Sequence, residues 1–264
     1  MSSPRSVIVT GATGYFGKYL TEALTKDFDR VLAFGRNAEK LEATFGHLPT
    51  VDRVVCDLND LEGIEGIVER LGREHRIHGL INNAYELSPK TGFNTPGGRL
   101  EQLSVDVVRH ALDTGLAAPL LLTKSVGVHM VEHEIPGSII NISSMYGTVS
   151  PSPKLYEGKT LFNPITYGMA KSALNAMTRY VASFWGAHGI RCNSVACGPF
   201  PNTETVTANS TRDEEFLQRL KDRIVTPDFG HPRDLVGIVR LLLSDDSRFI
   251  TGQTIGVDGG WTIV

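Results

Sequence analysis

Cysteine is scarce in this chain and does not cluster. The 264 residues include three cysteines, Cys56, Cys192 and Cys197, and no two of them stand in a CxxC spacing. An odd number without a regular spacing predicts reduced thiols rather than a disulfide framework. A chain of this length buries enough surface to fold without such cross-links. No bound metal is expected at the eight histidines either.

The sequence also lacks an excess of one charge, a long apolar run and a signal segment. Lysine plus arginine number 26 and aspartate plus glutamate 29, which gives a formal net charge of −3, whereas a nucleic-acid-binding protein would need a basic patch. The most apolar stretch, 115–123, is too short to span a bilayer. Residues 1–6 carry neither the basic start nor the long apolar core of a secretion signal. We therefore expect a cytoplasmic protein that binds neither nucleic acid nor a membrane.

What the sequence does contain is a regular alternation of short β-branched runs and longer helical patterns. Strands are expected at 7–10, 30–34, 54–56, 80–82, 138–142, 190–195 and 254–257. Helices are expected at 16–25, 38–45, 58–74, 100–134 with an interruption near 115–119, 165–188 and 232–243. The strands are apolar throughout, as in parallel strands covered on both faces. This order predicts the α/β class, with one doubly wound Rossmann-type parallel sheet of about seven strands in a single domain, residues 1–264.

Ligands of such sheets bind beyond the carboxyl ends of the strands, so the residues after each strand are the candidates. The first strand is followed by Thr10-Gly11-Ala12-Thr13-Gly14-Tyr15-Phe16-Gly17. Glycines permit a tight turn and leave room for a pyrophosphate, which the amides and dipole of the next helix would bind. Three glycines also fit a simple packing turn. Their place between the first strand and the first helix favours a dinucleotide site.

The residue after the second strand bears on the choice of dinucleotide. An acidic side chain there would bind the ribose 2′-hydroxyl of NAD, whereas Arg36 offers a positive charge suited to the 2′-phosphate of NADP. We therefore expect NADP(H), with NAD(H) as the alternative if Arg36 is only a solvated residue at a helix start.

Polar residues after the third and fourth strands would reach the same ligand. Asp57, followed by Leu58, fits either a hydrogen bond from the adenine amine or a cap on the next helix. Asn83 and Ala84 follow the fourth strand and lie near the same ligand, although an asparagine turn is the simpler interpretation.

The chemistry is expected at Tyr167 and Lys171, which stand four apart in a predicted helix. Side chains at that spacing share one helix face. A free tyrosine has a pKa near 10, and a neighbouring ammonium lowers it by stabilising the phenolate. In isolation this spacing is only an exposed pair. Its position after the fifth strand, which Ser143 and Ser144 follow, places it at the ligand edge of the sheet, where hydride chemistry needs a proton source and an oxyanion donor.

Together these motifs resemble the short-chain dehydrogenase/reductase family. The resemblance covers essentially the whole chain, with the motifs in order, and includes the closing Thr251-Gly252-Gln253 and Val257-Asp258-Gly259-Gly260. It implies that Ser144 hydrogen-bonds the substrate oxygen, Tyr167 exchanges the proton, and Lys171 holds the nicotinamide ribose and tunes Tyr167. It also implies that Asn82 and Ala84 line the adenosine, that the residues after Cys197, namely Gly198, Pro199 and Phe200, flank the nicotinamide, and that long helices join a homotetramer or homodimer.

The sequence departs from the family pattern at four places. The middle glycine of the loop comes one residue early, at Gly14, with Tyr15 in its usual place. Tyr85 replaces the glycine of the NNAG motif and would lie near the cofactor or the substrate mouth. Gly115 aligns with the asparagine of the proton relay, which puts the usual water relay in doubt but not the tyrosine chemistry. Cys197 replaces a proline, and we interpret it as a packed small residue rather than a reactive thiol.

The segment between Ser144 and Tyr167 is longer than is usual in the family. Its Tyr156-Glu157-Gly158 and Asn163-Pro164 resemble flagellin modification protein A, a group of bacterial short-chain dehydrogenases implicated in making unusual sugars. The segment either binds substrate or packs on a neighbouring subunit. The polar loop 199–217 is interpreted as a mobile lid or a solvated loop. The candidate substrate residues are Tyr85, Tyr146, Tyr156 and Asn202.

Three functions remain open from the sequence. The preferred one is an NADP(H)-dependent oxidoreductase acting on a small polar carbonyl or alcohol, such as a sugar or nucleotide-linked sugar. The second is a ketoreductase for acyl or polyketide-type ketones. The third is a catalytically weak dinucleotide-binding regulatory protein. The departures at Gly115, Tyr85 and the glycine loop suggest it, and the retention of Ser144, Tyr167 and Lys171 together opposes it.

Overall fold

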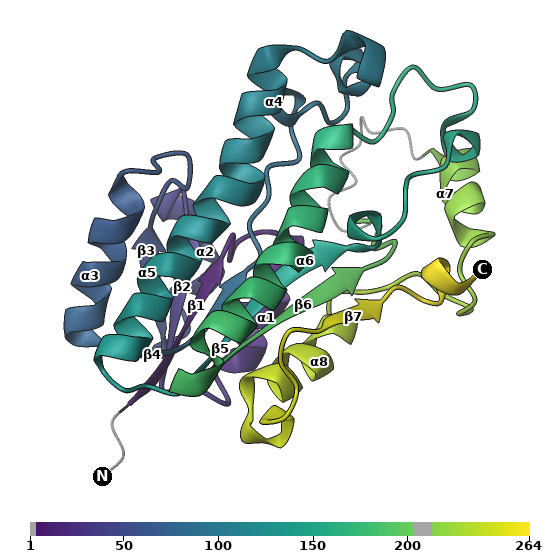
Figure 1. Ribbon diagram of the computed structural model, residues 1–264. Coiled ribbons are helices and arrows are strands. Elements are labelled where there is room, and N and C mark those ends of the chain that lie inside the picture. The colour runs from purple at the N-terminus through teal and green to yellow at the C-terminus, as the bar shows by residue number, and fades with distance from the viewer. Residues whose placement is uncertain (1–3, 203–212) are drawn as a thin grey trace.

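The computed structural model describes residues 4–202 and 213–264. Seven parallel strands form one sheet in the order β3-β2-β1-β4-β5-β6-β7 (Figure 1). Their bounds are β1 Arg5–Thr10, β2 Arg30–Gly35, β3 Val51–Val55, β4 Arg76–Asn82, β5 Gly137–Ser144, β6 Ile190–Cys197 and β7 Thr254–Val257. The predicted α/β class and parallel, doubly wound sheet are confirmed.

Helices cover both faces of this sheet. One face carries α1 (Tyr15–Leu24), α2 (Ala38–Phe45) and α8 (Asp234–Leu243), and the other carries α3 (Gly63–Glu74), α5 (Ala118–Glu132) and α6 (Ile165–Trp185). In Figure 1, α5 and α6 run side by side in front of the sheet. Right-handed crossovers between parallel strands place successive helices in this way.

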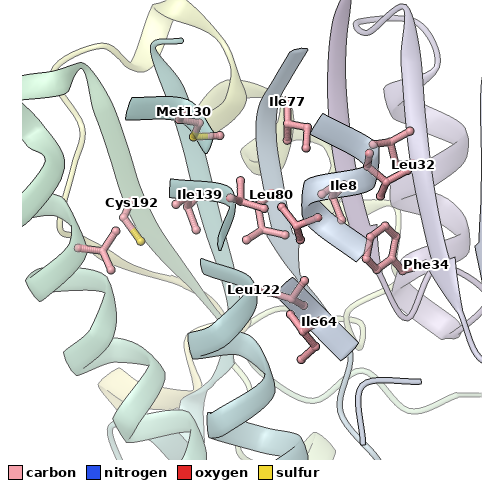
Figure 2. Packing of buried hydrophobic residues seen from close by; sticks show 14 of the residues in the cluster. Ile8, Leu32, Phe34, Ile64, Ile77, Leu80, Leu122, Met130, Ile139 and Cys192 are labelled. Atoms are coloured by element: carbon pink, nitrogen blue, oxygen red, sulfur yellow. The ribbon is translucent and has the colours of Figure 1, made fainter. Parts of the chain in front are cut away.

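The core lies in two layers because successive strand residues point to opposite faces. Ile8 of β1 packs toward α3, α5 and α6 together with Leu32 and Leu80, as Figure 2 shows. Its neighbours Val7 and Val9 pack toward α1, α2 and α8. Full burial of an aliphatic side chain stabilises a fold by roughly 1.5–3 kcal/mol, so these two layers stabilise the sheet whose edge carries the candidate residues.

The direction of winding reverses between β1 and β4. Strand β1 pairs with β2 on one side and with β4 on the other, with Val9 opposite Ile81. The connections leaving these two strands go to opposite faces, which leaves a crevice beyond their carboxyl ends. The glycine loop follows β1 at this point.

Several element bounds differ from the expectations. The helix expected at 58–74 begins at Gly63, because Asp57 Oδ1 accepts from Asn59 N at 3.0 Å and Asp60 Oδ1 accepts from Gly63 N at 3.1 Å. Such short polar side chains stabilise turns in competition with helix. Asp57 therefore caps a turn, not the helix. Strand β5 extends to Ser144, so that residue ends the strand.

The long helix expected at 100–134 consists of three parts. Helix α4 (Val105–Leu112) leads through a π-helical turn, Asp113–Ala117, into α5. The stretch Val105–Glu132 is long and apolar enough to cross a membrane by length and composition alone, and 61% of its most apolar window is buried inside the molecule. It packs on α3 and β4, as the core helix of a globular protein does.

Candidate active site

A cavity of about 600 Å³ lies beyond the carboxyl ends of the strands, within the size range of small-molecule and cofactor sites. Most of the predicted cofactor residues line it. They are Gly11, Thr13, Gly14, Tyr15, Phe16, Arg36, Asp57, Leu58, Asn83, Ala84, Tyr85, Tyr167, Lys171, Gly198 and Phe200. Residues that lie far apart in the sequence thus meet at one cavity.

The glycine loop is tied to the end of β4. Gly11 has a φ of 61°, a conformation that favours glycine, and a Cβ there would stand 3.0 Å from Ala84 Cα. Asn83 Nδ2 donates to Thr10 O at 2.8 Å, and the Asn83 and Ala84 amides donate to Thr10 Oγ1. The loop passes into α1 at Gly14, the N-cap. A close backbone turn before a helix N-terminus fits a dinucleotide pyrophosphate.

Three residues expected at the cofactor do not line this cavity, and neither does Ser144, which is expected at the substrate. Gly17 faces the loop itself, where a Cβ would stand 2.2 Å from Gly11 O, so its role is close packing of helix on turn. Asn82 is buried, and its Nδ2 donates to Thr123 Oγ1 and to a β5 side chain at 2.9 Å. Pro199 lines a neighbouring hollow of about 290 Å³. Gly17 and Asn82 therefore hold the scaffold rather than the ligand.

Tyr15, which stands where the family usually has glycine, reaches across the cavity rim. Its hydroxyl donates to Pro201 O at 3.4 Å. The ring of its neighbour Phe16 meets that of Phe200 edge-on, with centroids 5.1 Å apart. These contacts join the glycine loop to the segment after β6. Both segments line the cavity.

The basic end of the cavity contains more than Arg36. Lys40, in the first turn of α2, lines the same wall. It was not among the predicted cofactor residues, because no sequence motif marks it. Arg36 Nη1 lies 3.5 Å from Glu86 Oε2, which His110 Nε2 also contacts at 3.1 Å. Burial would raise the pKa of Glu86, but hydrogen bonds from Ser88 and His110 and the charge of Arg36 outweigh it and lower the pKa.

Tyr167 and Lys171 lie together on α6 at the opposite end of the cavity. Lys171 is buried, and its Nζ donates to Ile142 O at 2.7 Å. Burial lowers the pKa of Lys171 to about 8. Burial also raises the pKa of Tyr167 to about 12, although a hydrogen bond with Ser144 acts in the other direction. Burial is the largest of these effects on the Tyr167 pKa, and the predicted lowering by Lys171 stays a prediction.

The two serines at the end of β5 make different contacts. Ser144 is buried beside Tyr167, and its Oγ accepts from Tyr146 N at 3.1 Å. Ser143 lines the cavity, and its hydroxyl donates to Lys171 O at 3.1 Å. The strand end thus brings a hydroxyl, a phenol and an ammonium within one cluster, the set that proton exchange with a carbonyl oxygen needs.

The four candidate substrate residues separate into two groups. Tyr85 and Asn202 line the cavity. Tyr146 and Tyr156 do not line it: they hydrogen-bond one another and belong to the buried cluster that packs against Tyr167, and the centroid of the Tyr156 ring lies 4.6 Å from that of Phe162. Their expected contact with substrate stays a prediction. Residues 203–212 of the expected lid lie outside the described residues.

Cys197 lines the cavity beside Lys171 but is almost completely buried. Burial raises the pKa of its thiol to about 12. A protonated thiol is a poor nucleophile, which favours the packed-residue interpretation over a reactive role.

Two of the histidines lie close together. His129 on α5 and His133, the C-cap of that helix, stand four apart in the sequence, a spacing also found in metal sites. Their ring centroids lie 4.4 Å apart, and His129 Nε2 accepts from Ile77 N at 3.5 Å. Within 4–202 and 213–264, no three His, Cys, Asp or Glu side chains gather as a metal site would require. The absence of a metal stays a prediction.

Comparison with known proteins agrees with this geometry. A family model described as enoyl-(acyl carrier protein) reductase matches residues 24–262. The 7alpha-hydroxysteroid dehydrogenase of Bacteroides fragilis is 28% identical over 97% of this chain and 94% of its own, and an L-xylulose reductase of Caenorhabditis elegans is 29% identical over 98% and 96%. A solved protein of Beutenbergia cavernae, assigned as an NAD(P)-dependent gluconate 5-dehydrogenase with NADP bound at low occupancy, superposes with a TM-score of 0.82 at 29% identity over 100% and 98%. The chain belongs to the short-chain dehydrogenase/reductase family and is an NAD(P)-dependent oxidoreductase.

Proposed function

We propose that the protein transfers a hydride between NADP(H) and a small polar carbonyl compound or alcohol, with Tyr167 exchanging the proton. The observation that carries this proposal is that the glycine loop and the Tyr167–Lys171 pair open onto one cavity. The bound nicotinamide supplies or accepts the hydride. In the reducing direction Tyr167 would donate its proton to the carbonyl oxygen while the carbonyl carbon accepts the hydride, and solvent would then return a proton to Tyr167. One carbonyl, one NADPH and one solvent proton would give one alcohol and one NADP⁺.

Two residues near Tyr167 would orient the reactants: Ser144 the substrate oxygen and Lys171 the cofactor ribose. Ser144 lies within hydrogen-bonding reach of the phenol and would orient the substrate oxygen toward it. Lys171, held by Ile142 O, would bind a ribose hydroxyl with its remaining donors. Ser144 would thus orient the substrate and Lys171 the cofactor, each relative to Tyr167.

The preference for NADP(H) over NAD(H) rests on Arg36 and Lys40. Both line the cavity beyond the end of β2, and two positive charges suit a 2′-phosphate. The NADP bound to the Beutenbergia cavernae protein is consistent with this choice.

A fluorescence titration with NADPH and with NADH tests the preference. We expect tighter binding of NADPH, and Arg36→Asp to weaken NADPH binding by about tenfold or more while NADH binding holds or improves. Lys90→Asp, an exposed change that does not line the cavity, is the matched control. Equal NADPH affinities for the wild type and Arg36→Asp would contradict the assignment.

For the substrate we propose a sugar or nucleotide-linked sugar, as the resemblance to flagellin modification protein A suggests. The polar side chain of Asn202 at the cavity wall supports a hydroxylated ligand. A panel of keto sugars and of acyl-type ketones, assayed by NADPH oxidation, distinguishes the alternatives. Turnover of acyl-type ketones alone would reject the sugar proposal and leave the hydride chemistry intact.

We further propose one domain spanning residues 1–264, located in the cytoplasm, and a homodimer or homotetramer joined through α5 and α6. All seven strands belong to one sheet, which supports the single domain.

Exposed apolar side chains on α5 and α6 support the assembly: Leu120, Val128, Tyr180 and Phe184. Light scattering should give a dimer or tetramer, and Phe184→Glu should shift it toward the monomer.

A further inference from the structure

The Tyr85 ring lies directly against the backbone of Gly115. Gly115 lies in the π-helical turn before α5, and a Cβ there would stand 2.6 Å from Tyr85 Cε2 and 3.0 Å from Ala170 Cβ. The tyrosine ring therefore fills the volume that a side chain at position 115 would take. The two departures from the family pattern are structurally one feature.

The Tyr85 ring contacts both members of the candidate catalytic pair. It meets the Tyr167 ring edge-on, with centroids 5.0 Å apart and planes at 81°. Lys171 Nζ lies 5.1 Å from the Tyr85 ring centroid and 5.6 Å from that of Tyr167. Both contacts lie within the range in which an aromatic face attracts a cation.

We propose that Tyr85 is a positioning residue for the Tyr167–Lys171 pair. Its ring attracts the buried ammonium and fixes the tyrosine ring edge-on, and Gly115 is small so that the ring can lie there. The roles of Tyr167 and Lys171 rest on the proposed function, but the interaction with Tyr85 does not depend on the substrate.

The attraction has a predictable sign. The face of an aromatic ring stabilises the charged form of a neighbouring amine, whereas burial disfavours it. The groups that face Lys171 are the Cys197 thiol of β6, the Ile142 carbonyl of β5, and the Tyr85 and Tyr167 rings. Among the residues that the structure describes, no carboxylate is paired with Lys171. Loss of the Tyr85 ring without added water should therefore lower the lysine pKa further.

The test is an NMR titration of lysine-labelled protein without cofactor or substrate, with Lys171→Met to assign the signal. The wild-type signal should titrate near 8, as burial dictates. Tyr85→Phe keeps the ring and should titrate as the wild type does. Tyr85→Leu keeps an apolar side chain but no ring, and the lysine pKa should fall by about one pH unit.

Two further variants separate positioning from simple packing. Gly115→Ala should displace the ring and lower the lysine pKa in the same direction as Tyr85→Leu. The Phe93 ring meets the Tyr167 ring with centroids 5.3 Å apart and the Tyr85 ring with centroids 6.1 Å apart, and no contact between Phe93 and Lys171 is found in the described chain. Phe93→Leu removes a neighbour of both rings but keeps the Tyr85 ring itself, so it should lower the lysine pKa by much less than Tyr85→Leu does.

An unchanged or raised lysine pKa in a folded Tyr85→Leu protein overturns the proposal, and a Phe93→Leu shift equal to that of Tyr85→Leu does the same. Should Tyr85→Leu not fold, Gly115→Ala and Tyr85→Phe decide in the same way. If the wild type fails to bind NADPH, the proposed function fails. The lysine titration needs no cofactor, so it still tests the interaction between Tyr85 and Lys171.

Discussion

Arg36 forms an ion pair with Glu86, with 3.5 Å between Nη1 and Oε2. That carboxylate also binds His110 and Ser88, so it is well fixed while Arg36 itself is exposed. Removing the charge in Glu86→Gln should free Arg36 for a 2′-phosphate and tighten NADPH binding by about two- to fivefold, because exposed ion pairs are worth about 0.2–1 kcal/mol. NADH binding should not change.

The same fluorescence titration measures this effect, at low and at high salt. Glu101→Gln removes a carboxylate that pairs with Arg99 outside the cavity and serves as the control. A weaker affinity for NADPH in Glu86→Gln would show that Glu86 helps the ligand to bind rather than competing with it.

Two glycines in helices differ sharply in what surrounds them. A Cβ on Gly17 would stand 2.2 Å from Gly11 O and 2.8 Å from Ala12 Cα, whereas one on Gly66 would meet nothing within 4 Å. Gly17→Ala should therefore lower the free energy of unfolding by about 1–3 kcal/mol or more and weaken dinucleotide binding by moving the loop. Gly66→Ala should raise it by up to about 1 kcal/mol. Urea denaturation compares the two, and equal stability of both variants would refute the packing role of Gly17.

Site residues that belong to a sequence motif could be predicted, whereas residues brought together only by the strand order of the sheet could not. Tyr167, Lys171 and Gly11 line the cavity as expected because strand order alone places them there. Glu86 was missed because its contact with Arg36 joins the ends of β2 and β4, which are not neighbours in the sheet. No spacing along the chain encodes that distance.

Buried polar side chains link the central strands to the helices in front of them. Asn141 of β5 accepts from Asn82 of β4 at 2.9 Å and donates to Thr178 of α6 at 2.8 Å, and Thr178 in turn contacts Ser194 of β6 at 2.7 Å. Asn141→Leu should lower the free energy of unfolding by about 2–4 kcal/mol, because it leaves buried partners unsatisfied.

Chemical denaturation measures this loss, with Asn59→Leu, which changes an exposed turn residue, as the control. A loss below about 0.5 kcal/mol in Asn141→Leu would mean that the partners rearrange or that water replaces the amide.

Elements with a strong apolar pattern were predicted well, and elements formed by local polar contacts were not. Helix α7 (Glu214–Lys221) was missed because only Leu220 is buried on it. The late start of α3 was missed because Asp57 and Asp60 bind backbone amides in a turn. Helix propensity alone does not show which of these local bonds prevails.

For the molecule as a whole, stability should depend on pH through His129. Burial lowers the pKa of His129 to about 4, helped by the nearby charges of His133, Arg76 and His78. An unfolded histidine titrates near 6.5. Between these two values the unfolded chain binds a proton that the folded chain does not, so stability should fall as the pH decreases from about 6.5 to about 4.

Urea midpoints measured from pH 7 to pH 4 test this dependence. His129→Gln should flatten it, and His188→Gln, at an exposed site, should not. A wild-type slope that persists unchanged in His129→Gln would assign the dependence to other groups.

The central claim is that Tyr167 exchanges the proton in an NADPH-dependent reaction. The most direct test compares the wild type and Tyr167→Phe in NADPH binding and in NADPH oxidation with the best carbonyl of the substrate panel. The account predicts an NADPH affinity within about twofold and an oxidation rate lower by about 100-fold or more, since the phenol supplies general acid catalysis. A Tyr167→Phe protein that oxidises NADPH at the wild-type rate would contradict it.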